Sequence, residues 1–511
     1  MMNNLRGSAA MVAAAAAAVC LALLAGASAV TAGAHGAAAG RIAASGGAWG
    51  TAREVPGTKP LNLGGHAAID SVSCAAVGDC SAVGSYASSA LDRIPVLEAL
   101  VVSQTNGTWG TAEEAPGIAT LNAGGSAVLD SVSCAAVGEC SAGGYYTDSS
   151  GNHQALVISE TNGTWGTAEE VPGTSALNVG SPGAAIVSVS CSAVGACSAG
   201  GYYTGSSGLR QAFVVSEASG TWGTAKEVPG TAALNAGGYA QITAVSCAAA
   251  GACSAGGSYA SGAIDGIPTT QTFVVSEANG TWGTAKEVPG TAALNAGGYA
   301  QVTSISCASA GSCSAGGAYT NSTPATQAFV VRETNGTWAT ATEVRGIAAL
   351  NKRRLAMITS VSCASPGNCG AAGFYQDASF NSQAFVVSEA GGTWGTAEEV
   401  PGFATLDAAS AGGAPTSVSC GAAGDCSAGG YYTDSSGLRQ AFVVSEAGGT
   451  WGTAEEVPGT AALNAGGYAQ ITSLSCAAAG DCSAGGSYSS KTRNGVPNGQ
   501  PFVVSETGGA K

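Results

Sequence analysis

The sequence contains few histidines and few basic side chains. Its 511 residues include only three histidines, and 17 lysines and arginines stand against 32 aspartates and glutamates, which gives a net charge of −15. Binding to nucleic acid or to an anionic membrane surface needs basic patches, so we expect neither partner. Histidine, the commonest metal ligand, occurs only three times, and no cofactor motif is present. We therefore expect no metal and no cofactor.

The apolar run at the N-terminus predicts a secretory signal peptide. Arg6 precedes an apolar stretch from Ala9 to Ala25, and Ala27-Ser28-Ala29 offers a small-x-small cleavage site. A retained membrane anchor is one alternative, although the run is short, and a lipoprotein acylated at Cys20 is another. We expect a secreted protein that is not inserted in a membrane after cleavage. The expected parts are a signal peptide at residues 1–29, a Gly/Ala-rich linker at 30–45, a folded region at 46–508 and a tail at 509–511.

One repeat of about 57 residues fills the remaining sequence eight times. In one unit a tryptophan segment, Thr221 to Gly230, leads through a loop to Tyr239 to Cys247, Cys253 to Tyr259 and Thr272 to Glu277. These segments are short, rich in β-branched and aromatic residues, and bounded by Gly, Pro and Asn, so each unit is predicted to form four β-strands. No window has a helical period with caps. The eight tryptophans, spaced 56 to 60 residues apart, are Trp49, Trp109, Trp165, Trp222, Trp282, Trp338, Trp394 and Trp451.

A four-stranded repeat of this length suits a β-propeller blade, and an open β-solenoid is its main rival. The folded region opens with a tryptophan segment, Gly46 to Val55, and ends with Pro501 to Glu506, which no tryptophan segment follows. The two ends are complementary parts of one blade, and pairing them removes exposed strand edges. We therefore predict an all-β, eight-bladed β-propeller with four strands per blade, closed by pairing the N-terminal tryptophan strand with the last blade.

Sixteen of the 17 cysteines form pairs with the spacing C-x5-C, one pair in each repeat. The first cysteine ends one predicted strand and the second begins the next, so the two face each other across a hairpin at a bridgeable distance. Metal binding is the rival interpretation, but one pair supplies only two ligands. In a secreted chain we expect disulfides, each stabilising by roughly 2 kcal/mol. The expected bonds are Cys74–Cys80, Cys134–Cys140, Cys191–Cys197, Cys247–Cys253, Cys307–Cys313, Cys363–Cys369, Cys420–Cys426 and Cys476–Cys482.

The run Val-Val-Ser-Glu-x-x-Gly-Thr-Trp, at Val274 to Trp282, resembles the Asp-box repeat of sialidase-like propellers. That pattern, Ser-x-Asp-x-Gly-x-Thr-Trp, lies between the third and fourth strands of a blade, and a related run recurs here at all seven internal repeat boundaries. The Asp is missing and the spacing is one residue short. The C-x5-C repeats are also similar to those of secreted actinobacterial propeller-like proteins. The resemblance implies the fold but not sialidase activity, because that chemistry uses three arginines and most repeats here place none near the inner strand.

Comparison of the eight repeats identifies the candidate ligand-binding residues. The loops that enter the first strand and those that join the second strand to the third share one face of a propeller, called here the loop face, where function is expected. Tyrosine is the commonest residue eight positions before the first cysteine, and threonine is the commonest four positions before it. Several repeats depart from this pattern, and the sixth carries a basic cluster. The candidates are His66, Asp70, Asp130, Tyr239, Tyr299, Arg353, Arg354 and Tyr468.

We interpret these residues as a site for an acidic or polyhydroxylated ligand with tyrosines as stacking platforms; drift among redundant repeats is the alternative. The tryptophans are interpreted as structural, with an aromatic binding row as the alternative. Because Gly208 to Glu217 recurs unchanged at Gly437 to Glu446, we expect a non-catalytic module that makes multivalent contact with a glycan or a cell-surface protein. A glycan-active hydrolase or lyase, with Asp70, Asp130 and Arg353 in one pocket, and a structural surface protein remain alternatives. No catalytic residue is assigned.

Overall fold

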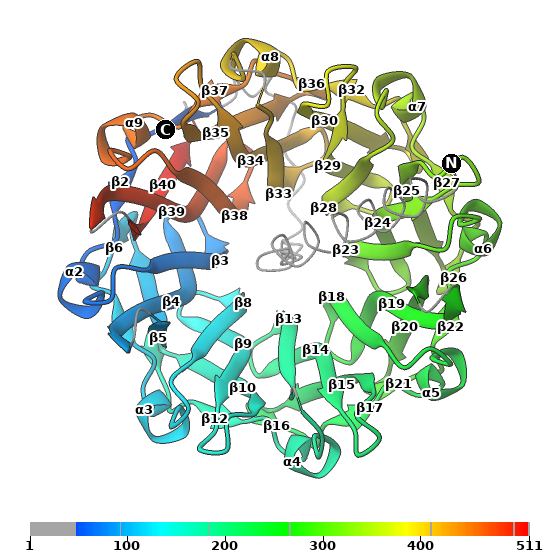
Figure 1. Ribbon diagram of the computed structural model, residues 1–511, viewed down its shortest axis with the longest axis horizontal. Helices are drawn as coiled ribbons and strands as arrows, with labels where there is room; N and C mark the ends of the chain where they lie inside the picture. The colour runs from blue at the N-terminus through cyan, green and yellow to red at the C-terminus, as the bar shows by residue number, and fades with distance from the viewer. Residues whose placement is uncertain are drawn as a thin grey trace, which may run out of the picture.

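The computed structural model describes residues 47–508 except 92–93, 182, 265–266, 409–410 and 494–495. The expected signal peptide, linker and tail lie outside the described residues. Eight antiparallel sheets stand around a central channel as the blades of a closed ring (Figure 1), which confirms the predicted eight-bladed propeller. None of the helices in the described part of the chain is long and apolar enough to cross a membrane.

The first strand of each blade lines the channel and packs against the first strands of both neighbouring blades. Serine side chains join these strands, as where Ser188 Oγ and Ser190 Oγ accept hydrogen bonds from the backbone N–H groups of Val245 and Cys247 in the next blade. In blade order the inner strands are β3 (Ala67–Ala76), β8 (Ala127–Ala136), β13 (Ala185–Ala193), β18 (Ala240–Ala249), β23 (Ala300–Ser309), β28 (Ala356–Ser365), β33 (Ala414–Ala422) and β38 (Ala469–Ala478).

The second and third strands form the body of each blade. They are longer in blades one, four and eight, where they extend as hairpin arms on the loop face. The second strands are β4 (Asp79–Leu91), β9 (Glu139–Thr147), β14 (Ala196–Thr204), β19 (Ala252–Ile264), β24 (Ser312–Thr320), β29 (Asn368–Gln376), β34 (Asp425–Thr433) and β39 (Asp481–Arg493). The third strands are β5 (Ile94–Thr105), β10 (His153–Thr161), β15 (Arg210–Ala218), β20 (Ile267–Ala278), β25 (Thr326–Thr334), β30 (Ser382–Ala390), β35 (Arg439–Ala447) and β40 (Val496–Thr507).

The predicted fourth strand is present as two short strands. The interruption arises because Ala225 N–H turns away from its own sheet and donates to Pro172 O of the preceding blade at 2.7 Å. The outer pairs are β6 (Thr108–Trp109) and β7 (Glu113–Glu114), β11 (Thr164–Trp165) and β12 (Glu169–Glu170), β16 (Thr221–Trp222) and β17 (Lys226–Glu227), β21 (Thr281–Trp282) and β22 (Lys286–Glu287), β26 (Thr337–Trp338) and β27 (Thr342–Glu343), β31 (Thr393–Trp394) and β32 (Glu398–Glu399), β36 (Thr450–Trp451) and β37 (Glu455–Glu456), and β1 (Ala48–Trp49) and β2 (Arg53–Glu54).

The sequence has no helical period, yet a short helix occurs at one place in each repeat. A one-turn helix follows the outer pair at the rim of the ring (Figure 1). In blade four it begins after Gly230, whose φ of 90° only glycine adopts readily, and Thr231 Oγ1 donates to Val228 O. Four residues are too few to leave a helical period in the sequence. The helices are α2 (Thr58–Leu61), α3 (Ile118–Leu121), α4 (Thr174–Leu177), α5 (Thr231–Leu234), α6 (Thr291–Leu294), α7 (Ile347–Leu350), α8 (Phe403–Leu406) and α9 (Thr460–Leu463).

The ring closes as predicted, through the N-terminal tryptophan strand. Strand β1 pairs with β40, with Trp49 opposite Glu506, and β2 pairs with the same strand, with Glu54 opposite Phe502. The last blade therefore combines the first and last described strands of the chain, which lie side by side in Figure 1.

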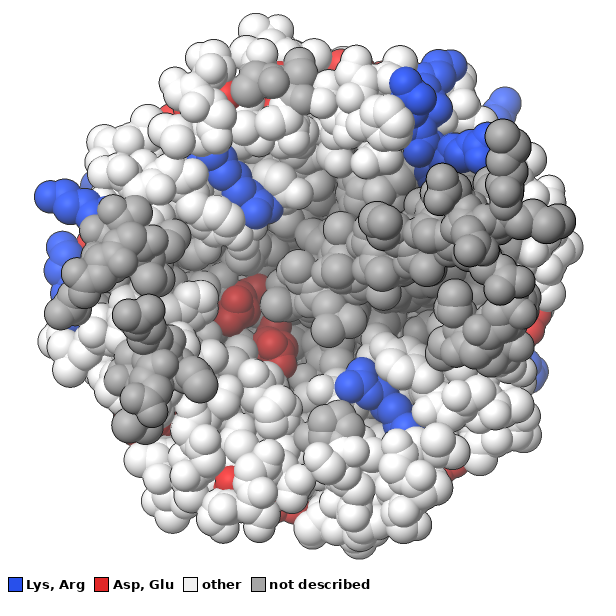
Figure 2. All heavy atoms as spheres, in the orientation of Figure 1, with Lys and Arg blue, Asp and Glu red and all other residues white. Residues whose placement is uncertain are grey.

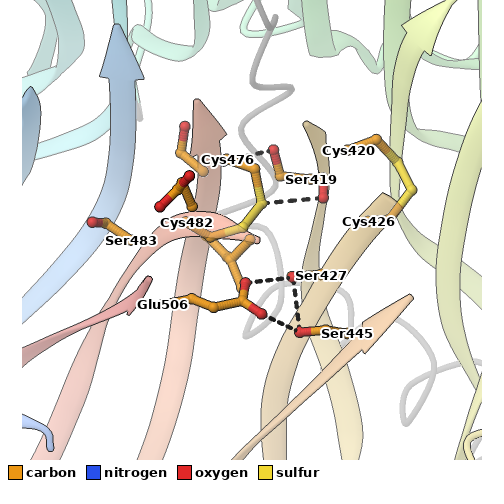
Figure 3. The surroundings of a disulfide bond; sticks show 12 residues. Ser419, Cys420, Cys426, Ser427, Ser445, Cys476, Cys482, Ser483 and Glu506 are labelled. Carbon is orange, nitrogen blue, oxygen red and sulfur yellow. Dashed lines mark hydrogen bonds between the residues drawn. A yellow bond between two sulfur atoms is a disulfide. The ribbon is translucent and has the colours of Figure 1, made fainter. Parts of the chain in front are cut away.

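All eight predicted disulfides are present, with sulfur–sulfur distances of 2.04 to 2.08 Å. Beside them the Asp-box-like run joins neighbouring blades. In Figure 3, Glu506 of β40 reaches into blade seven and accepts hydrogen bonds from Ser427 Oγ at 2.9 Å and Ser445 Oγ at 2.7 Å. Trp49 Nε1 also donates to Ser445 Oγ at 3.3 Å. At this boundary the Ser, Glu and Trp of the run thus connect one blade to the next, which supports the structural interpretation of Trp49.

Candidate functional site at the channel mouth

A β-bulge interrupts every inner strand at the position four residues before its cysteine. In blade four the bulge residue is Thr243, whose Oγ1 lies 2.6 Å from Val302 O in the next blade and 3.1 Å from Gly256 O in its own. Threonine makes the same bridge from blades five to eight. Bulges re-aim a side chain and recur beside functional sites. In blades one and two the bulge residues are Asp70 and Asp130.

The two aspartates lie on adjacent inner strands, half-buried on the channel wall. Neither carboxylate has a hydrogen-bond donor among the residues that the structure describes. Burial raises the pKa of Asp70 to about 7. Burial and then the negative charge of Asp70 raise the pKa of Asp130 well above its usual value. The structure therefore brings these two candidates together as an electrostatically coupled pair, and acidic side chains are visible on the channel wall in Figure 2.

Two of the three candidate tyrosines are paired with arginines that the sequence analysis missed. The Cζ atom of Arg210 lies 3.7 Å from the ring centre of Tyr202 and 5.2 Å from that of Tyr239. Four blades further on, Cζ of Arg439 lies 3.2 Å and 4.8 Å from the rings of Tyr431 and Tyr468. Cations are attracted to the faces of aromatic rings, so each guanidinium is held beside two tyrosines. We call these groups the Arg210 platform (Tyr202, Arg210, Tyr239) and the Arg439 platform (Tyr431, Arg439, Tyr468).

One asparagine at the end of the one-turn helix positions each platform. Asn235 Nδ2 donates to Arg210 O at 2.9 Å, and its Oδ1 accepts the backbone N–H of Tyr239 at 2.6 Å. Asn464 makes the same two bonds to Arg439 O and to Tyr468 N–H, at 2.8 and 2.7 Å. The hairpin of one blade is thereby fixed against the loop that enters the next blade, and the backbone that carries the arginine and the tyrosine is held by bonds within the protein.

The platforms flank the channel on two sides. Their strands belong to blades three and four and to blades seven and eight, which stand opposite each other in the ring (Figure 1). Figure 2 shows basic side chains at the rim on these two sides and acidic side chains between them. Each platform continues into an exposed leucine: Leu209 is 44 % exposed and Leu438 is 41 % exposed.

The other candidate residues do not join these groups. Tyr299 Oη donates to Gln301 Oε1 at 3.0 Å, and Thr270 stands where the platforms have arginine. His66 is exposed beside blade one. Arg353 lies in blade six, where its Nε donates to Ala378 O at 2.7 Å and its guanidinium stacks on Phe380. Blade six is on the far side of the ring from Asp70 and Asp130, so the convergence that a hydrolase would need from these three residues is not found. Arg354 has a φ of 70° in the same loop.

The sequence did contain a signal for the platforms. The segment Gly-Leu-Arg-Gln and, one repeat later, the segment Asn-Ala-Gly-Gly-Tyr occur together only at Arg210 and Tyr239 and at Arg439 and Tyr468. Treating each repeat as a unit hid this coincidence, because each platform is built from two consecutive repeats.

A cleft of about 480 Å³ lies on the opposite face, between the disulfide turns of blades one and two. Its wall includes the disulfide Cys134–Cys140, Gln104 and Glu160. Glu160 accepts hydrogen bonds from Ser81 and Ser103 of blade one, as the equivalent Glu506 does in blade seven. The polar groups Glu160, Ser81 and Ser103 are therefore already used in hydrogen bonds between blades one and two.

No protein-family model matches the sequence, and no curated protein matches it. Solved structures with a similar arrangement include a protein of unknown function from Dyadobacter fermentans, with 10 % identity over 90 % of this chain and 100 % of that one, and a TM-score of 0.37. A Hadza microbial sialidase has 11 % identity over 81 % of this chain and 73 % of its own, with a TM-score of 0.33. An ulvan lyase has 10 % identity over 80 % and 95 %, with a TM-score of 0.34.

Proposed function

We propose that the protein is a secreted, non-catalytic glycan-binding module whose ligand contacts the rim of the channel on the loop face. The observation that carries the proposal is the occurrence of two copies of one platform, each with a guanidinium beside two tyrosine rings. Sugar rings present apolar C–H faces and hydroxyl edges, which match an aromatic side chain beside a hydrogen-bond donor. The eight disulfides fit an oxidising, extracellular compartment.

Two identical platforms favour binding over catalysis. An enzyme needs one constellation of acid, base and electrophile around one bond, whereas a binding module gains avidity from each added copy. The asparagine hydrogen bonds fix each platform in advance, which reduces the entropy lost on binding.

A glycan-array screen of residues 30–511 with oxidised disulfides tests the proposal. We expect saturable binding to a defined set of glycans, and loss of at least about tenfold in affinity when Tyr239→Ala and Tyr468→Ala are combined. Tyr299→Ala is the matched control, because this tyrosine occupies the same loop position without an arginine, and it should bind like the wild type. A blank array, or equal effects of all three tyrosines, would contradict the proposal.

The aspartate pair supports a glycan-active hydrolase or lyase as a second candidate function. A carboxyl group with a pKa near 7 beside a second carboxyl group is the electrostatic arrangement that general acid–base chemistry uses. Release of new reducing ends from any glycan bound on the array, abolished by Asp70→Asn, would replace the binding module with this enzyme.

A further inference from the structure

The two platforms are duplicates in sequence and in position. Residues 208–217 and 437–446 are identical, and so are the loops Asn235 to Thr243 and Asn464 to Thr472. Because the copies are four blades apart in an eight-bladed ring, they are related by half a turn about the channel. The protein therefore presents the same group of side chains twice, at opposite points of the channel rim (Figure 2).

The arginines of both platforms have no carboxylate partner among the residues that the structure describes, where the ion pairs are Lys59–Glu54 and Arg332–Glu389. Arg210 Nη1 donates to Gln241 Oε1 and Arg439 Nη1 donates to Tyr468 Oη, both at 3.1 Å. Acidic residues outnumber basic ones by 32 to 17 in this chain, so two half-buried guanidinium groups without a counter-ion are unexpected. A charge removed from water without a partner is costly, and burial lowers the pKa of Arg439.

The geometry limits where a counter-ion can bind. Two tyrosine rings lie beside each guanidinium, with ring centres 3.2 to 5.2 Å from Cζ. Arginine donates hydrogen bonds only through its in-plane N–H groups, and Nη1 already donates to Gln241 or Tyr468, so a ligand accepts from the in-plane N–H groups that remain. A planar carboxylate accepts two such parallel N–H bonds from an arginine. The exposed leucine next to each arginine offers an apolar surface to the ring that carries the carboxylate.

We propose that each platform binds one hexuronate residue of an acidic polysaccharide, with its carboxylate on the arginine edge, so that one protein molecule holds two such chains and cross-links them. This inference rests on the proposed glycan-binding function and adds the ligand class, the number of sites and their independence. Two sites related by half a turn about the channel hold their ligands in opposite chain directions, which favours two separate chains over one chain bound twice.

Isothermal titration of residues 30–511 with a galacturonate hexamer, and with its carboxyl-reduced neutral form, tests the inference. We expect two equivalent sites per chain for the acidic hexamer and at least tenfold weaker binding of the neutral one. Arg210→Gln and Arg439→Gln should each leave one site with unchanged affinity, and the double variant should leave none. Arg210→Lys should lose the site as well, because an ammonium group cannot form the planar pair of bonds.

Cross-linking is measured by light scattering with a long polygalacturonate. The wild type should produce turbidity with a maximum at intermediate protein concentration, and either single variant should not, although it still binds. Thermal melting of every variant confirms that it is folded, and Arg353→Gln, in the blade-six loop, is the matched control that should keep both sites and the turbidity.

The results separate the two proposals. A stoichiometry other than two, equal binding of the neutral hexamer, or full binding by the folded double variant overturns the inference. If the array shows a neutral glycan whose binding is lost in the Tyr239→Ala, Tyr468→Ala variant, the glycan-binding function stands and the hexuronate inference fails. A blank array together with no titration signal removes both.

Discussion

At the scale of single residues, one position in the inner strand separates blades one and two from blades four to eight. In blade four this position is Thr243, which donates a hydrogen bond to a carbonyl of the next blade. In blades one and two the same position is Asp70 or Asp130, and an ionised carboxylate can only accept hydrogen bonds. A protonated aspartic acid can replace the threonine hydroxyl as donor, whereas the ionised form cannot. Burial of the carboxyl group raises the pKa of Asp70 to about 7, so the protonated form is favoured below that pH.

This predicts a stability that falls as pH rises. The pKa of Asp70 is higher in the folded protein than the usual value near 3.9 in an unfolded chain, so the folded state binds more protons between about pH 4 and pH 7 and is stabilised at the acidic end. We expect Asp70→Thr to raise the urea midpoint at pH 8 more than at pH 5. Urea denaturation of the wild type and the variant at both pH values, with the disulfides intact, measures this difference in midpoint.

Thr303→Val provides the matched comparison for this position. Thr303 Oγ1 makes the bridge to Ile358 O at 2.7 Å, so its loss should cost about 1 kcal/mol at both pH values. An Asp70→Thr variant that keeps the pH dependence of the wild type would show that the carboxyl group is not its source.

At the scale of strands and loops, the predicted elements were confirmed where their formation depends only on residues within one repeat. The three long strands, the hairpin at each C-x5-C pair and the closing strand follow from local spacing and turn residues. The split of the outer strand could not be predicted, because the N–H group of Ala225 bonds to the preceding blade. The need for glycine in the second strand could not be predicted either, because it depends on close packing in the folded ring. A Cβ on Gly257 would lie 1.9 Å from Gln241 O, and one on Gly256 would lie 2.9 Å from Val302 of the next blade.

The candidate site was predicted only in part for the same reason. Tyr239, Tyr468, Asp70 and Asp130 were found because each stands at a fixed distance before a cysteine of its own repeat. The arginines that complete the platforms come from the preceding repeat, and their contacts depend on how one blade docks on the next. Functional residues in this sequence are therefore recognised only when neighbouring repeats are compared in pairs, because each platform takes residues from two of them.

At the scale of the whole molecule, the ring is closed by non-covalent contacts at one blade. Trp49 is buried there, Tyr488 Oη donates to Glu54 Oε2 at 2.7 Å, and β1 and β2 cover the edge of β40. In the other blades a two-residue turn connects the equivalent strands, as at Gly391-Gly392. The first and last glycines of the described range, Gly47 and Gly508, both lie against Gly480 of the neighbouring disulfide turn.

Joining Gly508 directly to Gly47 recreates the sister sequence Glu-x-Gly-Gly-x-Trp. We therefore expect a circular permutant with this joint, opened between Asn335 and Gly336 of an exposed turn, to fold into the same ring with a melting temperature close to that of residues 47–508.

A chain that lacks residues 47–56 should instead lose about 3 to 5 kcal/mol of its free energy of unfolding, the cost of removing a buried tryptophan, and should associate through the uncovered edge of β40. Differential scanning calorimetry and light scattering measure the two effects. A permutant that melted at as low a temperature as the truncated chain would contradict this prediction. Closure of the ring would then depend on where the chain is opened and not on the contacts of the outer strand.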